Sequence, residues 1–114
     1  MSTQVLQAVF EAVESKKGNN PVLLDMREIS IITDYFLVTD GHNPIHVKAI
    51  AEGIKEGLGE IGFFPSRVEG HKEGRWILLD YGFLVAHILT GEERDFYRLE
   101  QLWHEAKVMT PNYS

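Results

Sequence analysis

Three observations predict that the chain folds as one α+β domain, with a mixed sheet of about five strands packed against helices. The first is its length, because 114 residues suit one hydrophobic core and are too few for two. The second is its hydrophobic residues, which make up 44% of the chain and recur at helical spacing in some segments and in short strand-like runs in others. The third is the order of these segments, with a helix at each end and another between the second and third strands.

The first half of the chain contains two predicted helices and two predicted strands. An apolar stripe predicts a helix over Thr3–Lys16, with Gly18 as its C-terminal cap. A short buried strand follows over Val22–Asp25, and the aromatic and β-branched run Tyr35–Thr39 predicts a second strand. A long helix is then expected over Asn43–Gly62, because asparagine is a favoured N-cap and the proline after it suits the first helical position.

Gly53 and Gly57 lie inside this long helix, at the edge of its apolar stripe. Each costs about 1 kcal/mol relative to alanine in a helix interior. Either the helix tolerates them, or they allow a neighbouring backbone to approach closely, within the fold or across a dimer.

The second half contains three predicted strands, which should form an antiparallel meander. They cover Ser66–Glu69, Arg75–Asp80 and Phe83–Leu89, and the residues Tyr81 and Gly82 between the last two are short enough for a two-residue hairpin turn. The helix between the second and third strands of the chain permits one parallel pair of strands.

A last helix is expected to begin at Thr90, which forms a capping box with Glu93. Its apolar stripe consists of Phe96, Leu99, Trp103 and Ala106. Residues 108–114 are predicted to form a flexible tail of a single domain that covers residues 1–114.

The predicted hairpin separates its side chains into two different faces. One face is wholly aliphatic and is predicted to be core; it carries Ile77, Leu79, Leu84, Ala86 and Ile88. The other pairs Asp80 with Phe83, Leu78 with Val85 and Trp76 with His87. If helices cover only the first face, the second is available to a partner, since tryptophan is common in binding hot spots. The alternative is that Trp76 packs under a helix with its indole N–H satisfied.

Composition argues against several classes of function. The net charge is −6 and the 11 basic residues are scattered, which disfavours direct nucleic-acid binding. The absence of cysteine removes thiolate nucleophiles and cysteine zinc sites. No apolar stretch is long enough for a membrane span and no signal peptide is evident, so we expect a complete, cytoplasmic protein.

Metal and nucleotide sites are also not expected. His42 and His46 are four residues apart, but His42 precedes the helix and no third ligand accompanies them. There is no glycine-rich phosphate loop. A two-metal site needs clustered carboxylates, whereas four aspartates are isolated at strand ends, where they are expected to be solvated: Asp25, Asp34, Asp40 and Asp80.

Six segments in order, over about residues 3 to 107, resemble the ribosomal silencing factor (RsfS/Iojap) family. They are Ser30–Phe36, Val47–Ala51, Val68–Gly70, Trp76–Gly82, Ala86–His87 and the pattern Tyr97-x-Leu99-Glu100-x-Leu102-Trp103. The resemblance implies a cytoplasmic, non-enzymatic protein without a cofactor, with a nucleotidyltransferase-like topology that lacks the active-site carboxylates. Members of the family are often homodimers.

The resemblance also implies how such a protein acts. It binds the large ribosomal subunit through the fourteenth large-subunit ribosomal protein, blocks joining of the small subunit, and represses translation when nutrients are short. Carried over by position, the partner-binding residues are Glu69, Trp76, Leu78, Asp80 and His87. An acidic domain with such a face suits a basic ribosomal protein rather than ribosomal RNA.

The chain departs from the family pattern at two positions. Phe83 follows the hairpin glycine where the family usually has a polar or acidic residue, and Asn43–Ile45 replaces the usual serine and arginine at the entrance to the long helix. Two other readings remain open at this point: an enzyme of the nucleotidyltransferase class, and a dimeric adaptor for another basic protein.

Overall fold

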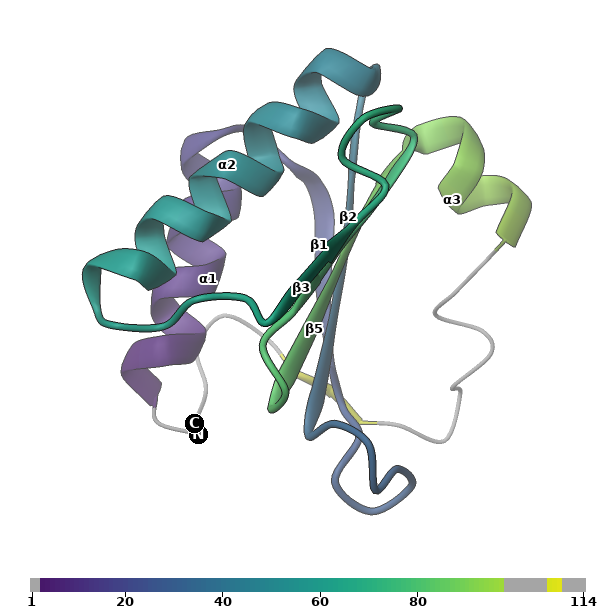
Figure 1. Cartoon of the computed structure of the whole chain (residues 1–114). Helices are drawn as coiled ribbons and strands as arrows, with labels where there is room; N and C mark the ends of the chain where they lie inside the picture. Colours follow the sequence, from purple (N-terminus) through teal and green to yellow (C-terminus); the bar gives the residue numbers. More distant parts are fainter. Residues whose placement is uncertain (1–2, 98–106, 110–114) are drawn as a thin grey trace.

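The computed structural model describes residues 3–97 and 107–109, which form one mixed sheet with helices on both faces (Figure 1). The elements are α1 (Thr3–Ser15), β1 (Asn19–Asp25), β2 (Tyr35–Gly41), α2 (Pro44–Glu60), β3 (Arg67–Glu69), β4 (Trp76–Asp80), β5 (Leu84–Thr90), α3 (Gly91–Tyr97) and β6 (Lys107–Met109). The strand order is β3-β4-β5-β2-β1-β6. The predicted α+β class and its five strands are confirmed, and β6 is an additional strand.

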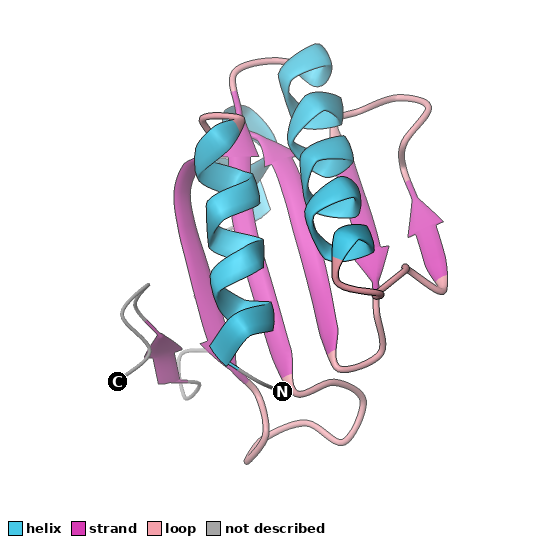
Figure 2. Ribbon diagram, turned by 90° about the vertical axis from the view of Figure 1, so that its left-hand side faces the viewer, coloured by secondary structure: helices cyan, strands magenta, loops and turns pink. Residues whose placement is uncertain are grey.

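Helices α1 and α2 lie side by side across one face of the sheet, and α3 lies on the other (Figure 1, Figure 2). The strands β3, β4 and β5 form the predicted antiparallel meander, and β2 runs parallel to β5. The core lies between the sheet and the α1/α2 layer. It contains every residue of the predicted aliphatic face of the hairpin: Ile77, Leu79, Leu84, Ala86 and Ile88.

The end of α1 differs in detail from the prediction. Lys17, with a φ of 59°, adopts the left-handed conformation that we expected at Gly18. The Gly18 N–H donates to the Val13 carbonyl at 2.9 Å and the Lys17 N–H to the Glu14 carbonyl at 2.9 Å, the pattern of a Schellman cap. Gly18 is needed for space instead, because an added Cβ would lie 2.6 Å from the Val13 side chain.

Gly53 and Gly57, two of the three glycines of α2, lie on the side of the helix that faces α1 and its C-terminal end. A Cβ added at Gly57 would lie 3.3 Å from the Cβ of Ala12, and one added at Gly53 would lie 2.7 Å from Cγ of Lys16. Close approach within the fold is therefore confirmed for Gly57, which also lies near the Ala8 carbonyl, whereas Gly53 meets only the side chain of Lys16. The N-terminus of α2 also forms as predicted, since the Asn43 side chain accepts a hydrogen bond from the His46 N–H at 2.9 Å.

The predicted register of the β4–β5 hairpin is wrong by two residues. The Tyr81 N–H donates to the Leu84 carbonyl at 2.8 Å, so Gly82 and Phe83 form the turn, and Asp80 pairs with Val85. Gly82 has a φ of 85°, which explains the shift, because glycine accepts this conformation far more readily than tyrosine. A shift of two residues leaves every side chain on its predicted face.

Only part of the predicted last helix can be assessed. The Glu93 N–H donates to Thr90 Oγ1 at 3.3 Å, but the Glu93 carboxylate pairs with Arg75 rather than returning to Thr90, so the capping box is half formed. Leu99, Trp103 and Ala106 lie outside the described residues. Two residues of the predicted tail instead belong to β6, which pairs with β1.

Candidate functional site

The sheet face opposite α1 and α2 brings together all five predicted partner-binding residues. Strand pairing aligns Glu69 with Leu78, and Leu78 with His87, across β3, β4 and β5. Asp80 lies on the same face in the adjacent row, and Trp76 lies at the opposite end of β4. We call this surface the open face; its β3 and β4 part consists of Arg67, Glu69, Trp76, Leu78 and Asp80.

Exposure on the open face is greatest on β3 and β4. On β2 and β5 the side chains of Val38, Val85 and His87 are buried. On β4 Trp76, Leu78 and Asp80 are half-buried, and on the edge strand β3 Glu69 is exposed. The most accessible part of the face is therefore formed by β3 and β4, although Phe36 on β2 is also half-buried.

The indole of Trp76 is held by His87. Its Nε1–H donates to Nδ1 of His87 at 3.1 Å, and the two ring centroids are 5.9 Å apart. The N–H is satisfied, as the structural reading of this tryptophan expected, yet the ring is only half-buried. Phe36 meets the same imidazole edge-on at 5.1 Å. His87 is only 7% exposed and thus sits behind Trp76 as its support.

Burial keeps the His87 imidazole uncharged by lowering its pKa from 6.5 to about 4. Since Nδ1 accepts the indole hydrogen bond, Nε2 carries the proton, and no acceptor within the described residues meets this buried atom. The neutral ring is therefore a condition of the folded state.

This condition predicts a pH-dependent stability. As the pH falls below 6.5, the unfolded chain takes up a proton at His87 while the folded protein resists it, so stability is lost toward pH 4. Between pH 7.5 and 5 we expect His87 to contribute a loss of about 2 kcal/mol in the free energy of unfolding. Urea denaturation at both pH values measures it. His87→Gln should lose about 2 kcal/mol less over this interval, and equal losses would contradict the assignment.

Charged side chains form a small network at the open face that includes a residue the sequence analysis missed. Nε of Arg67 lies 3.2 Å from Oε2 of Glu69, and its Nη2 lies 3.8 Å from Oδ2 of Asp80. Asp80 also accepts the Gly82 N–H at 2.8 Å, which orients its carboxylate. The only sequence signal for Arg67 was its position two residues before Glu69 on a strand, which places both on one face.

A second charged pair, also missed, attaches α3 to the sheet. Nη1 of Arg94 lies 3.0 Å from Oδ2 of Asp40 and donates to the backbone carbonyls of Asn19 and Asn20 at 3.2 and 2.9 Å. Both side chains are buried. The expectation that Asp40 is solvated is therefore wrong, because a helix distant in sequence covers it.

His42 and His46, considered above as metal ligands, make hydrogen bonds within the fold instead. The His42 N–H donates to Nδ1 of His46 at 2.9 Å, and the other ring nitrogen of His46 contacts the Lys16 carbonyl at 2.8 Å. Within residues 3–97 and 107–109 no three histidine or acidic side chains are grouped as a metal site would need. No helix in these ranges is long and apolar enough to cross a membrane.

The sheet separates three of the four aspartates that were expected to be isolated: Asp25, Asp40 and Asp80. Asp25, at the end of β1, is paired with Arg27 at 2.7 Å. Asp80, at the end of β4, lies on the opposite face of the sheet from Asp25, and the strands β5 and β2 separate β4 from β1. Asp40 is at the other end of β2. These three carboxylates are thus kept apart, whereas a two-metal site holds its ions about 4 Å apart.

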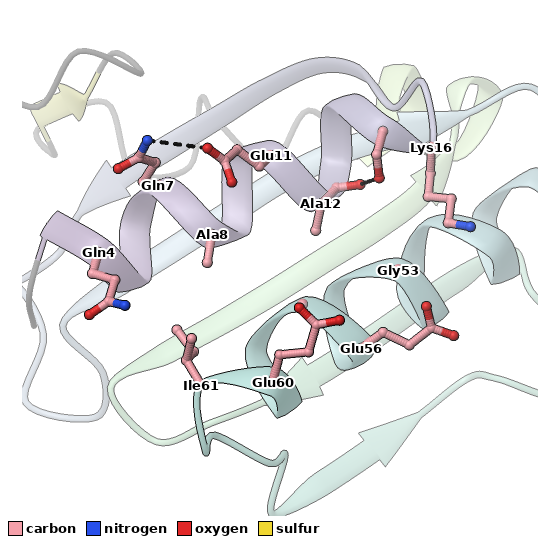
Figure 3. A pocket seen from close by; sticks show the side chains of 12 residues that line it. Gln4, Gln7, Ala8, Glu11, Ala12, Lys16, Gly53, Glu56, Glu60 and Ile61 are labelled. Carbon is pink, nitrogen blue, oxygen red and sulfur yellow. Dashed lines mark hydrogen bonds between the residues drawn. The ribbon is translucent and has the colours of Figure 1, made fainter.

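A groove of about 560 Å³ lies between α1 and α2, on the far side of the sheet from the open face (Figure 3). Ala8, Ala12, Gly53 and Gly57 are among the residues that line it, and three glutamates project beside it: Glu11, Glu56 and Glu60. The groove follows from the close packing of the two helices.

Comparisons with known proteins identify the family. Residues 1–113 match the family model described as "Ribosomal silencing factor during starvation". The ribosomal silencing factor RsfS of Halalkalibacterium halodurans is 41% identical over 110 residues, which cover 96% of this chain and 94% of that protein. A crystal structure of a Chromobacterium violaceum protein matches with a TM-score of 0.86 and 32% identity, covering 91% of this chain and 88% of the other.

A more distant relative is the mouse protein named "Mitochondrial assembly of ribosomal large subunit protein 1", which is 28% identical over 74 residues, covering 62% of this chain and 32% of the mouse protein. The similarity to the bacterial proteins extends over nearly the whole chain, in sequence and in fold. The resemblance read from the six motifs is confirmed: the chain belongs to the ribosomal silencing factor (RsfS) family.

Proposed function

We propose that this protein binds the large ribosomal subunit through a basic ribosomal protein, the fourteenth of that subunit, and sterically blocks joining of the small subunit. Translation is then repressed when nutrients are limiting, and the protein acts in the cytoplasm. The observation that carries the proposal is the open face, where the half-buried Trp76 and Leu78 are flanked by the carboxylates of Glu69 and Asp80.

The chemistry of this surface suits a basic protein surface. A tryptophan with a fixed ring can fill a pocket of a partner at low entropic cost. Acidic side chains at the rim of the binding surface steer cationic partners toward it. The names of the relatives support a ribosomal partner, and the name of the mouse relative refers to the large subunit. His87 contributes from behind, because it fixes the orientation of the Trp76 indole.

Steric blocking needs no catalytic group, and we propose that the protein is not an enzyme and uses no cofactor. The separation of Asp25, Asp40 and Asp80 supports this over a nucleotidyltransferase activity. The nucleotidyltransferase-like topology and the homodimer implied by the family remain predictions. A dimer that used the open face would compete with the ribosome, so monomers would then be the active species.

A subunit-joining experiment tests the proposal. Purified subunits mixed with the protein before addition of Mg²⁺ should sediment as free subunits, whereas untreated subunits should join. The protein should co-sediment with the large subunit, less so as the salt concentration rises, because rim charges are screened. The proposal would be contradicted if the protein co-sedimented with the small subunit alone. It would also be contradicted if the subunits joined normally when the large subunit was saturated with the protein.

A further inference from the structure

Arg67 is a cation on a face that we propose to bind a basic partner. We infer that it acts as an internal competitor: in the free protein its guanidinium occupies Glu69 and Asp80, which the partner's cations must take over. This inference rests on the proposed function, since it concerns the same face, and it predicts the unusual result that removal of a charged residue from the interface strengthens binding.

The geometry gives Arg67 access to both carboxylates at once. It lies directly opposite Asp80 in the pairing of β3 and β4, and Glu69 lies two residues further along β3 on the same face. The guanidinium is 3.2 Å from the Glu69 carboxylate and 3.8 Å from that of Asp80. A single side chain therefore neutralises half of the negative charge that this part of the face offers.

The exposure of these groups makes the exchange feasible. The side chain of Arg67 is 62% exposed, that of Glu69 is 58% exposed, and Asp80 is 26% exposed. Exposed ion pairs of this kind are worth about 1 kcal/mol or less, so a partner's arginine or lysine can displace Arg67 at small cost. The buried Asp40–Arg94 pair on the same side of the sheet could not exchange in this way.

The acidic site does not depend on Arg67 for its shape. The Gly82 N–H holds the Asp80 carboxylate at 2.8 Å, and the main-chain pairing with β4 holds Glu69 in register. Without Arg67 the same two carboxylates remain at the surface and lose the ion pairs with its guanidinium. Removal of Arg67 also abolishes its repulsion of the incoming partner, which accelerates association at low salt.

The test compares Arg67→Gln with Arg75→Gln. Arg75 is 63% exposed, pairs with a glutamate at 3.3 Å and lies at the opposite end of β4 from Asp80, so both variants change the net charge from −6 to −7 at similarly exposed positions. Binding to purified large subunits is measured at low and moderate salt. At low salt Arg67→Gln should bind about two- to fivefold more tightly than Arg75→Gln, and the difference should shrink as salt rises. Arg67→Lys should restore wild-type affinity.

Two results would overturn the inference while the proposed function stands. Equal affinities of Arg67→Gln and Arg75→Gln would show that no competition exists, and weaker binding of Arg67→Gln would show that Arg67 contacts the partner itself. The double variant Arg67→Gln/Asp80→Asn should lose the gain, because the carboxylate that Arg67 releases is gone. Failure of the wild-type protein and of both single variants to bind large subunits would overturn the proposed function and the inference with it.

Discussion

Asp40→Ala should lower the free energy of unfolding by about 3 to 5 kcal/mol, the largest loss of stability that we expect from an ionic side chain of this protein. The aspartate is buried and pairs with the equally buried Arg94 at 3.0 Å. Its removal takes the Asp40 carboxylate away from the buried Arg94 guanidinium between the sheet and α3. For a domain of this size the melting temperature should fall by about 10 to 20 °C, which calorimetry or thermal circular dichroism would measure.

The double variant Asp40→Ala/Arg94→Met separates a charge effect from a packing effect. Methionine removes the cation but retains an unbranched apolar side chain, so the double variant should be more stable than Asp40→Ala alone. Glu52→Ala serves as the control, because Glu52 is exposed and pairs with Lys55 and His71 at the surface; its cost should stay below about 1 kcal/mol. A double variant less stable than Asp40→Ala would contradict the assignment of the loss to a stranded charge.

The pair also illustrates what a sequence cannot predict. Asp40 and Arg94 are 54 residues apart, and they meet because β2 is placed beside β5, directly before α3. Neighbouring residues predict that β2 ends near Asp40, and a strand end in isolation suggests a solvated carboxylate. The order of strands in the sheet depends on long-range packing, which no local pattern in this chain reveals.

The faces of the hairpin, in contrast, were predictable although its register was not. Side chains alternate along a strand with a period of two, so the aliphatic face and the face with Trp76 follow from the order of the residues in each strand. The turn depends on which residue accepts a positive φ, and Gly82 takes the first turn position rather than the second. Because the resulting shift was two residues, the predicted site remained on one face.

The shared face of the five candidate residues was predicted from the sequence, but their different burial was not. His87 was expected to be a contact residue, whereas it is buried behind Trp76. Arg67 lies on the same face and was not considered, because the predicted meander pairs its strand with that of Asp80 but does not fix the register that sets the two residues opposite each other.

Trp76→Ala should abolish the proposed anti-association activity while leaving a folded protein. Truncation of a hot-spot tryptophan costs 2 kcal/mol or more of binding free energy, so affinity for large subunits should fall by at least about 30-fold. The stability cost should be about 2 kcal/mol, less than the 3 to 5 kcal/mol of a fully buried tryptophan, because the ring is half-buried and its removal leaves Nδ1 of His87 without its donor. Subunit joining and co-sedimentation measure the first effect, and urea denaturation the second.

Two matched variants test which property of Trp76 contributes to binding. One separates the ring from its hydrogen bond, and the other controls for the loss of an exposed aromatic side chain. Trp76→Phe retains a ring but removes the indole donor, so it should bind with an affinity between those of the wild type and Trp76→Ala. Phe64→Ala removes a side chain that is 72% exposed but lies outside the open face, and it should leave binding unchanged within about twofold. If Trp76→Ala instead loses 3 to 5 kcal/mol of stability yet keeps its affinity, the tryptophan is a core residue and the open face is not the docking surface. That result would also remove the basis for the role of Arg67, because both depend on a partner that approaches β3 and β4.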